Sequence, residues 1–136
     1  MTTIKYITIH CSASPQGRGD TAETIHGWHL QRGWAGIGYH HVILEDGTIE
    51  NGRPHYWIGS HVGGHNSGNL GICLIGDYVF TDEQYSALAS LLRDLLDKYP
   101  KAKILGHTNW PDTHKTCPNF DVAIFLADIG LENIIA

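Results

Sequence analysis

The sequence predicts a single α/β domain that spans residues 1–136, with a central mixed β-sheet flanked by about three helices. Two observations lead to this fold class. Segments with the two-residue period of strands alternate along the chain with segments that have the period of amphipathic helices. In addition, "LGICLIGDY" (70–78) is a nearly continuous apolar run, typical of a strand buried on both faces of a sheet. The length and the apolar fraction of 42% fit one domain with a sizeable core.

The first half of the chain should contain a strand, a helix and a hairpin, in that order. The stretch "KYITIHCS" alternates between two side-chain faces and predicts a strand. In "DTAETIHGWHLQRG", Asp20 and Glu23 have the spacing of a capping box and would begin a helix that Gly33 ends. Asp46 and Gly47 lie between two β-type runs and therefore predict a hairpin turn.

The second half should contain a long helix, a strand and a short closing helix. Thr81 and Gln84 form a capping pattern in "TDEQYSALASLLRDLLDKYP", whose apolar residues recur on one helical face until Pro100 ends the helix. The run "AKILGH" predicts a further strand, and Asp121 begins a short helix in "FDVAIFLADI". The sequence shows no internal repeat, low-complexity segment or linker, which favours one domain.

Composition and charge argue against several classes of protein. The formal charge is −5, from 9 basic and 14 acidic residues without a basic run, so we expect no nucleic-acid partner. No apolar run approaches the ~20 residues that span a bilayer, so we expect no membrane insertion. The amino end lacks the pattern of a secretory signal peptide, so the protein should stay cytoplasmic until it is released. Three cysteines, an odd number, argue against a disulfide framework.

Ligand-type side chains are concentrated in "GHTNWPDTHKTCPNFD", near the end of a chain that has 10 histidines. His107 follows the buried run "KILG", and Cys117 comes ten residues later. Imidazole and thiolate are good zinc ligands, but a catalytic zinc site normally has three protein ligands. His10, near the end of the first strand, is the best third candidate. A histidine at a strand end is also often a hydrogen-bonded structural residue, so the spacing alone leaves both interpretations open.

Four segments of the chain, in the same order, resemble the zinc-dependent N-acetylmuramoyl-L-alanine amidases. The resemblance is strongest to phage endolysins of the lysozyme type, whose domain is shared with peptidoglycan recognition proteins. It implies a hydrolase that uses one Zn²⁺ ion to cut the amide bond between the lactyl group of N-acetylmuramic acid and L-alanine. The segments are "ITIHCSAS", "GWAGIGYHHVILEDGTIENGRP", "IGSHVGGHNSGNLGICLIGDY" and "GHTNWPDTHKTCPNFD".

The resemblance also assigns roles to individual residues. It implies that His10, His107 and Cys117 are the zinc ligands. It further implies that Tyr39 in "GYHH" and Lys115, two residues before the cysteine, are catalytic. In such a site zinc polarises the amide carbonyl and lowers the pKa of bound water. The lysine ammonium would stabilise the developing oxyanion, and the tyrosine would position the attacking water.

A glycine-rich loop, "GSHVGGHNSGN", corresponds to the substrate side of the family's active site. Glycines allow a glycan or peptide to approach closely, and His61, His65 and Asn66 could hydrogen-bond such a substrate. Alternatively, these polar groups satisfy the backbone of the loop itself. We therefore treat the three residues as candidate substrate-binding residues.

Other ligand-type residues have weaker support. His114 is interpreted as a bystander. It could replace one ligand, because this segment varies in length among the relatives that the chain resembles, but it directly precedes the implied catalytic lysine and adjacent side chains diverge. Cys11 and Cys73 are interpreted as core cysteines. His41 would share a strand face with Tyr39 and is therefore a candidate to support the site indirectly.

Several functions compete. The leading hypothesis is a monomeric phage or prophage endolysin that acts on bacterial peptidoglycan and needs a holin-type pore to reach it. A cytosolic amidase that recycles soluble muropeptides would use the same chemistry, but would prefer small substrates over the polymeric wall. A non-catalytic peptidoglycan-binding module would typically lack a zinc ligand, whereas all three candidates are present here. A cysteine hydrolase would not explain His10, His107 and Lys115 at the family's positions.

Overall fold

The computed structural model describes residues 3–134 and contains one five-stranded sheet. The strands are β1 (Tyr6–Cys11), β2 (His41–Ile43), β3 (Ile49–Asn51), β4 (Asn69–Leu74) and β5 (Lys103–Gly106). Their order across the sheet is β3-β2-β4-β1-β5. β3 pairs antiparallel with β2, and the other pairings are parallel. The sheet is therefore mixed, as predicted.

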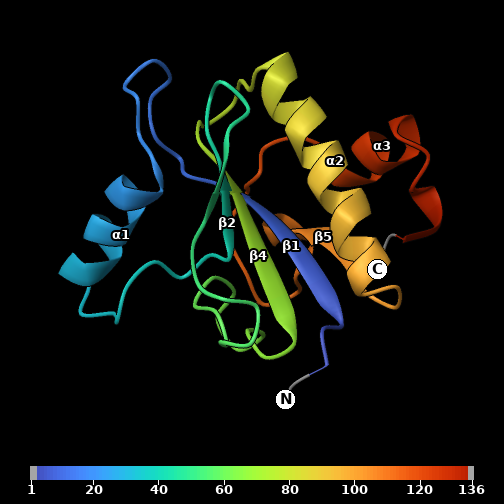
Figure 1. Ribbon diagram of the computed structural model, residues 1–136, viewed down its shortest axis with the longest axis horizontal. Coiled ribbons are helices and arrows are strands. Elements are labelled where there is room, and N and C mark those ends of the chain that lie inside the picture. The colour runs from blue at the N-terminus through green and yellow to red at the C-terminus, as the bar shows by residue number, and fades with distance from the viewer. Residues whose placement is uncertain (1–2, 135–136) are drawn as a thin grey trace.

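Three α-helices accompany the sheet within the described residues, and two of them begin where the sequence predicts. The helices are α1 (Ala22–Gln31), α2 (Asp82–Lys98) and α3 (Val122–Asp128), with 3₁₀ turns η1 (His107–Asn109) and η2 (Glu132–Ile134). Figure 1 shows α1 and the pair of α2 and α3 on opposite sides of the sheet. At α2, the Thr81 hydroxyl accepts from the Gln84 N–H and the Gln84 side chain accepts from the Thr81 N–H. At α3, the Asp121 carboxylate accepts from the Ile124 N–H.

The capping box predicted for α1 at Asp20 and Glu23 is wrong, because the box lies one residue later. The Thr21 hydroxyl accepts from the Thr24 N–H, and the Thr24 hydroxyl accepts from the Thr21 N–H. The Asp20 carboxylate instead pairs with the Arg18 guanidinium at 2.8 Å. A carboxylate held by a cation two residues earlier is not free to cap the helix.

The two faces of the sheet differ in polarity, and this difference determines where a site can form. α2 and α3 cover one face, where Ile7 and Ile9 of β1 pack with leucines of α2 in the main core. Each such side chain contributes roughly 1.5–3 kcal/mol on burial. The other face presents Thr8 and His10 of the same strand, and near α1 it has only a small apolar cluster around Ile25. The core therefore stabilises the fold from one face and leaves the other for polar side chains.

The hairpin predicted at Asp46 and Gly47 joins β2 to β3. The Leu44 N–H donates to the Thr48 carbonyl at 2.8 Å, which closes the turn. Gly47 has a φ of 88°, a backbone conformation that favours glycine. The turn chemistry therefore explains why the chain reverses here.

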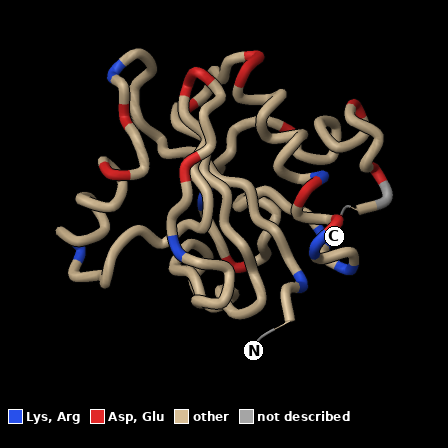
Figure 2. The backbone as a smooth tube through the Cα atoms, viewed as in Figure 1, with Lys and Arg blue, Asp and Glu red and all other residues tan. Residues whose placement is uncertain are grey.

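Charged side chains are dispersed over the surface. Figure 2 shows Lys and Arg interspersed with Asp and Glu on most of the chain that the structure describes. Within residues 3–134, no helix is both long enough and apolar enough to cross a bilayer.

Candidate metal centre and groove

The three predicted metal ligands come together at one edge of the sheet. One donor atom from each of His10, His107 and Cys117 lies within 4.8 Å of the other two. The two imidazole centroids are 4.6 Å apart, and His107 Nδ1 lies 3.5 Å from Cys117 Sγ. Tetrahedral zinc, with bonds of ~2.0–2.1 Å to nitrogen and ~2.3 Å to sulfur, separates such ligands by about 3.5 Å. The donor types and their spacing both fit zinc.

The parallel register of β1 and β5 brings the two histidines together. Ile9 of β1 pairs with Gly106 of β5. His10 and His107 are the next residues along the two strands, so they reach the same edge of the sheet side by side. The carboxyl ends of parallel strands are the usual place for a site in sheets of this kind.

Two backbone features return the chain from His107 to Cys117. The Thr108 N–H donates to the Cys117 carbonyl at 2.9 Å and closes the base of the intervening loop. Gly106 allows the returning segment to approach, because a Cβ at this position would lie 2.8 Å from Cδ of Pro118. A larger residue at position 106 would push the cysteine away from its partners.

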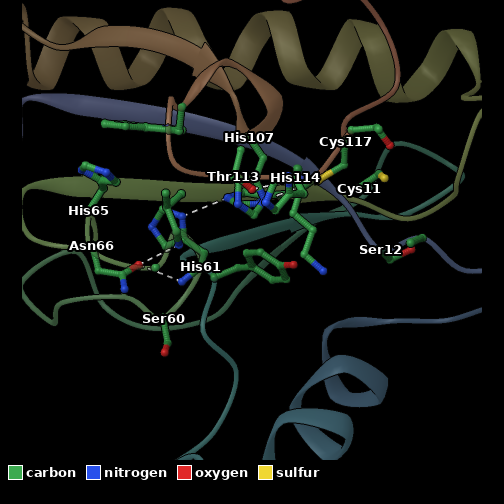
Figure 3. Close-up of a pocket in the computed structure, with 18 of the residues that line it drawn as sticks. Cys11, Ser12, Ser60, His61, His65, Asn66, His107, Thr113, His114 and Cys117 are labelled. Atoms are coloured by element: carbon green, nitrogen blue, oxygen red, sulfur yellow. Dashed lines mark hydrogen bonds between the residues drawn. The ribbon is translucent and has the colours of Figure 1, made fainter.

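The surroundings of Cys117 favour its thiolate, the form that binds zinc. The adjacent Cys11 thiol, as the largest cause, and the nearby rings of His10 and His107 hold the pKa of Cys117 well below its ordinary value. Cys11 is a buried core residue, as predicted, but its contact with Cys117 was missed (Figure 3). The same contact raises the pKa of Cys11.

The His10 ring is held from its other side by His61. His10 Nε2 lies 2.9 Å from His61 Nδ1, and His61 Nε2 lies 2.8 Å from the backbone carbonyl oxygen of Asn69. Both rings are almost completely buried, and burial lowers the pKa of each. We therefore treat both imidazoles as neutral near pH 7.

The two implied catalytic residues reach the same region from different loops. The Tyr39 ring centroid lies 5.0 Å from that of His10. Burial raises the pKa of the Tyr39 phenol well above its ordinary value, so the phenol stays protonated and can donate a hydrogen bond. Lys115 is exposed on the loop that leads to Cys117 and lines the same groove.

A groove of about 770 Å³ contains the donor cluster. Figure 3 shows its side chains converging from the loop of residues 60–66 and from the segment around His107, His114 and Cys117. His114 is exposed there and lines the groove. Because the groove contains both the donor cluster and the two implied catalytic residues, a substrate that lies in it would contact both.

The predicted substrate-binding residues His61, His65 and Asn66 also line this groove, and each already has partners within the protein. Asn66 Oδ1 accepts from the backbone N–H groups of His61 and the following residue, both at 2.8 Å. The His65 ring stacks on Trp110, with 4.6 Å between centroids, and its Nε2 lies 2.9 Å from Asp112 Oδ2. These contacts shape the groove wall, and substrate binding by the three residues stays a prediction.

The prediction that His41 supports this site is wrong. β2 begins at His41, and Tyr39 lies before the strand, so the assumed alternation does not extend back to it. His41 instead faces the other side of the sheet, where its Nε2 lies 2.7 Å from Nε2 of His55. The prediction failed because β2 begins at His41, after Tyr39.

Two histidines of α1 have a supporting role that was missed. His26 Nδ1 accepts from the Ile37 N–H at 3.0 Å, and His29 Nδ1 accepts from the Gly38 N–H at 2.9 Å. These bonds hold the segment that carries Tyr39. The available signal was the spacing of three residues, which places both rings on one face of a helix.

The fold and the site geometry agree with the comparison to known families. The family described as N-acetylmuramoyl-L-alanine amidase matches residues 1–120. This chain belongs to that family. The predicted family and the predicted class of enzyme, an amidase that hydrolyses peptidoglycan, are thereby confirmed.

Individual relatives of the amidase support the same assignment. This chain is 40% identical over 122 residues to the endolysin of Enterobacteria phage K11, with 84% of this chain and 80% of that protein covered. It is 39% identical over 124 residues to the endolysin of Escherichia phage T7, with 85% and 81% covered. Among solved structures, the N-acetylmuramoyl-L-alanine amidase LysC from Clostridium intestinale URNW matches with a TM-score of 0.85 and 32% identity. That match covers 96% of this chain and 87% of LysC.

Proposed function

We propose that this amidase binds one zinc ion through His10, His107 and Cys117 and cuts the amide bond between the lactyl group of N-acetylmuramic acid and L-alanine. The observation that carries this proposal is the cluster of three donor atoms within 4.8 Å at the groove. Two neutral imidazoles and one thiolate contribute a charge of −1, so a bound Zn²⁺ retains a net positive charge. Such an ion supplies Lewis acidity toward the amide carbonyl and lowers the pKa of water.

The chain's own residues orient the reactants and stabilise charge. The protonated Tyr39 donates a hydrogen bond that positions the attacking water beside His10. The Lys115 ammonium stabilises the negative charge that develops on the carbonyl oxygen. The oxygen of water joins the lactyl carbonyl carbon, the C–N bond breaks, and the nitrogen of L-alanine takes up a proton.

The biological role we propose is that of a phage or prophage endolysin acting on bacterial peptidoglycan. The support comes from the similarity to phage endolysins over more than four fifths of the chain. We further propose that the enzyme acts as a monomer and reaches the wall through a holin-type pore when the host cell lyses.

A product assay tests the reaction. Purified peptidoglycan is incubated with the enzyme, and new amino groups are counted against new reducing sugar ends. We expect new L-alanine amino termini that disappear with a chelator and return with added zinc. New reducing ends, or cleavage that survives complete metal removal, would contradict the proposal.

A substrate comparison tests the role. We expect faster release of L-alanine amino termini from polymeric peptidoglycan than from soluble muropeptides at the same concentration of stem peptide. A clear preference for the small muropeptides would instead indicate a recycling enzyme.

A further inference from the structure

His61 forms the middle of a short chain of hydrogen bonds that ends at a proposed zinc ligand. Its Nε2 lies 2.8 Å from the backbone carbonyl oxygen of Asn69, and its Nδ1 lies 2.9 Å from Nε2 of His10. The carbonyl belongs to the first residue of β4, and His10 lies on the neighbouring strand β1. The ring therefore links the sheet backbone to the ligand.

The chemistry of the partners determines which nitrogen carries each proton. A carbonyl oxygen only accepts, so His61 Nε2 carries a proton and donates to Asn69. In a neutral ring the other nitrogen has a lone pair, so His61 Nδ1 accepts. His10 Nε2 must then donate, which leaves the lone pair of His10 on Nδ1. A lone pair on this nitrogen is what a metal ion needs from a histidine ligand.

Two glycines leave the space that the His61 ring occupies. A Cβ at Gly71 would lie 2.7 Å from Cγ of His61, and a Cβ at Gly59 would lie 2.7 Å from its Cδ2. His61 is only 9% exposed, so the ring fills a space that side chains at both positions would close. The fold is thus shaped around one orientation of this imidazole.

We propose that His61 is a positioning residue, which fixes His10 in the Nε2–H tautomer and presents its Nδ1 to the zinc ion. This inference rests on the zinc site proposed above. His61 is not itself a ligand in this arrangement, because its Nδ1 faces His10 and its Nε2 faces the backbone.

The neutral character of His61 suits a site that already contains a thiolate. Ligating histidines usually donate their second N–H to a carboxylate, a backbone carbonyl or water. A carboxylate at this position would cancel the net positive charge that Zn²⁺ keeps with two imidazoles and Cys117. A neutral imidazole orients His10 equally well and leaves that charge available to the developing oxyanion.

Zinc affinity, measured without substrate by competition with a chromophoric chelator, tests the proposal. We expect His61→Leu to weaken zinc binding by roughly 10- to 100-fold, the usual effect of losing such a partner. His61→Asn places an amide oxygen near the former Nδ1 and should restore most of that loss. Equal affinity of wild type and His61→Leu would overturn the proposal.

His40 provides a matched control for loosening of the same region. Its ring centroid lies 5.8 Å from that of His61, but its two nitrogens bond only the backbone of Gly71 and Trp57. We expect His40→Leu to lower stability while the folded protein keeps its zinc affinity. If His40→Leu and His61→Leu weaken zinc binding equally, general loosening explains the effect and the proposal fails.

The tautomer of His10 in the zinc-free protein gives a second test that needs neither metal nor activity. A long-range ¹H–¹⁵N correlation spectrum should show His10 with its proton on Nε2 in the wild type and mixed tautomers in His61→Leu. A proton on Nδ1 in the wild type would overturn the proposal. An enzyme that binds zinc through an oriented His10 but cleaves no amide would refute the proposed function alone.

Discussion

Two hydrogen-bonded pairs of histidines lie on opposite faces of the same sheet, and one of them contributes to the proposed metal site. In the groove-side pair, His10 and His61 are linked at 2.9 Å, and in the helix-side pair, His41 and His55 are linked at 2.7 Å. The groove-side pair ends in a ring nitrogen of His10 that lies within 4.8 Å of Cys117 Sγ, whereas the helix-side pair ends in polar groups that satisfy it completely.

The helix-side pair is closed by a partner at each end. His41 Nδ1 lies 3.2 Å from Asn51 Oδ1, and His55 Nδ1 lies 2.8 Å from the Tyr99 hydroxyl. An amide oxygen accepts, so His41 donates to it and accepts from His55, which in turn accepts from Tyr99. No lone pair is left for a metal. The two pairs therefore differ in whether a ring nitrogen is left free beside a thiolate, and this difference, more than the number of histidines, supports the metal site proposed at the groove.

Replacing the thiolate should produce the largest difference between the two regions. We expect Cys117→Ser to lose zinc and reduce amidase activity to background, because a serine hydroxyl is a poor substitute for a thiolate ligand. His55→Ala, which breaks the helix-side pair, should keep a full equivalent of zinc. Metal content after gel filtration and release of amino groups measure both effects. Full zinc content in Cys117→Ser would contradict the ligand assignment.

The next effect separates charge stabilisation from metal binding within the groove. Lys115→Ala should lower kcat by about 10²- to 10³-fold while one zinc ion stays bound, since one stabilising donor of an oxyanion contributes this much. His114→Ala removes the exposed neighbouring side chain and should change kcat little. Steady-state kinetics and metal analysis on both variants provide the test. Loss of zinc in Lys115→Ala would show that the lysine supports the metal instead.

The helix-side pair should affect stability through pH. Burial, with the nearby charge of His55 as a smaller cause, lowers the pKa of His41 to about 4, below the ordinary 6.5. Above pH 6.5 both states are neutral at this ring and nothing is lost. As the pH falls below 6.5, His41 becomes protonated in the unfolded chain but stays neutral in the folded protein. The free energy of unfolding therefore decreases until the pH reaches about 4.

Urea unfolding of the wild type and of His41→Gln at pH 7 and pH 5 measures this contribution. The wild type should lose about 2 kcal/mol more than the variant over this interval. Other buried histidines remain in both proteins, so their contributions cancel in the difference. Equal losses in the two proteins would show that His41 takes up its proton in the folded state as readily as in the unfolded chain.

The smallest expected effect concerns a third histidine contact, at the rim of the groove. His65 lies 2.9 Å from the carboxylate of Asp112, whose side chain is 72% exposed. We expect Asp112→Asn to change the free energy of unfolding by less than about 1 kcal/mol, because exposed ion pairs contribute little. Thermal unfolding at low and high salt measures it. A larger, salt-dependent loss would mean that this contact joins the two groove walls.

Much of the fold could be predicted from the sequence because local rules decide it, and the three residues that the family resemblance implies as ligands do come together. The period of the apolar residues and the caps at Thr81 and Asp121 predict the correct elements. His10 lies near the end of β1 and His107 directly follows β5, and these two strands pair in parallel, so the meeting of the two histidines follows from the topology.

What could not be predicted depends on relations between distant residues. The bond from His10 to His61 joins residues 51 positions apart and requires the register of two strands together with a glycine cradle. The contact between Cys11 and Cys117 crosses the edge of the sheet, which alternation along one strand cannot reveal. The prediction for His41 was wrong because β2 begins at His41. Tyr39 lies before the strand, so the alternation of side chains along the strand does not relate the two residues.

The bond between the Thr108 N–H and the Cys117 carbonyl fixes the two ends of the segment between them, so this segment can differ in length and sequence without a change in the rest of the domain. Both ends of this segment are tied together beside the proposed metal ligands, so its length can change without moving them. Doubling the length of a flexible loop costs only about 0.6 kcal/mol in closure entropy. Insertions near the exposed Asp112 can therefore change the shape of the groove and alter which peptidoglycan is bound, while the proposed hydrolytic centre stays the same.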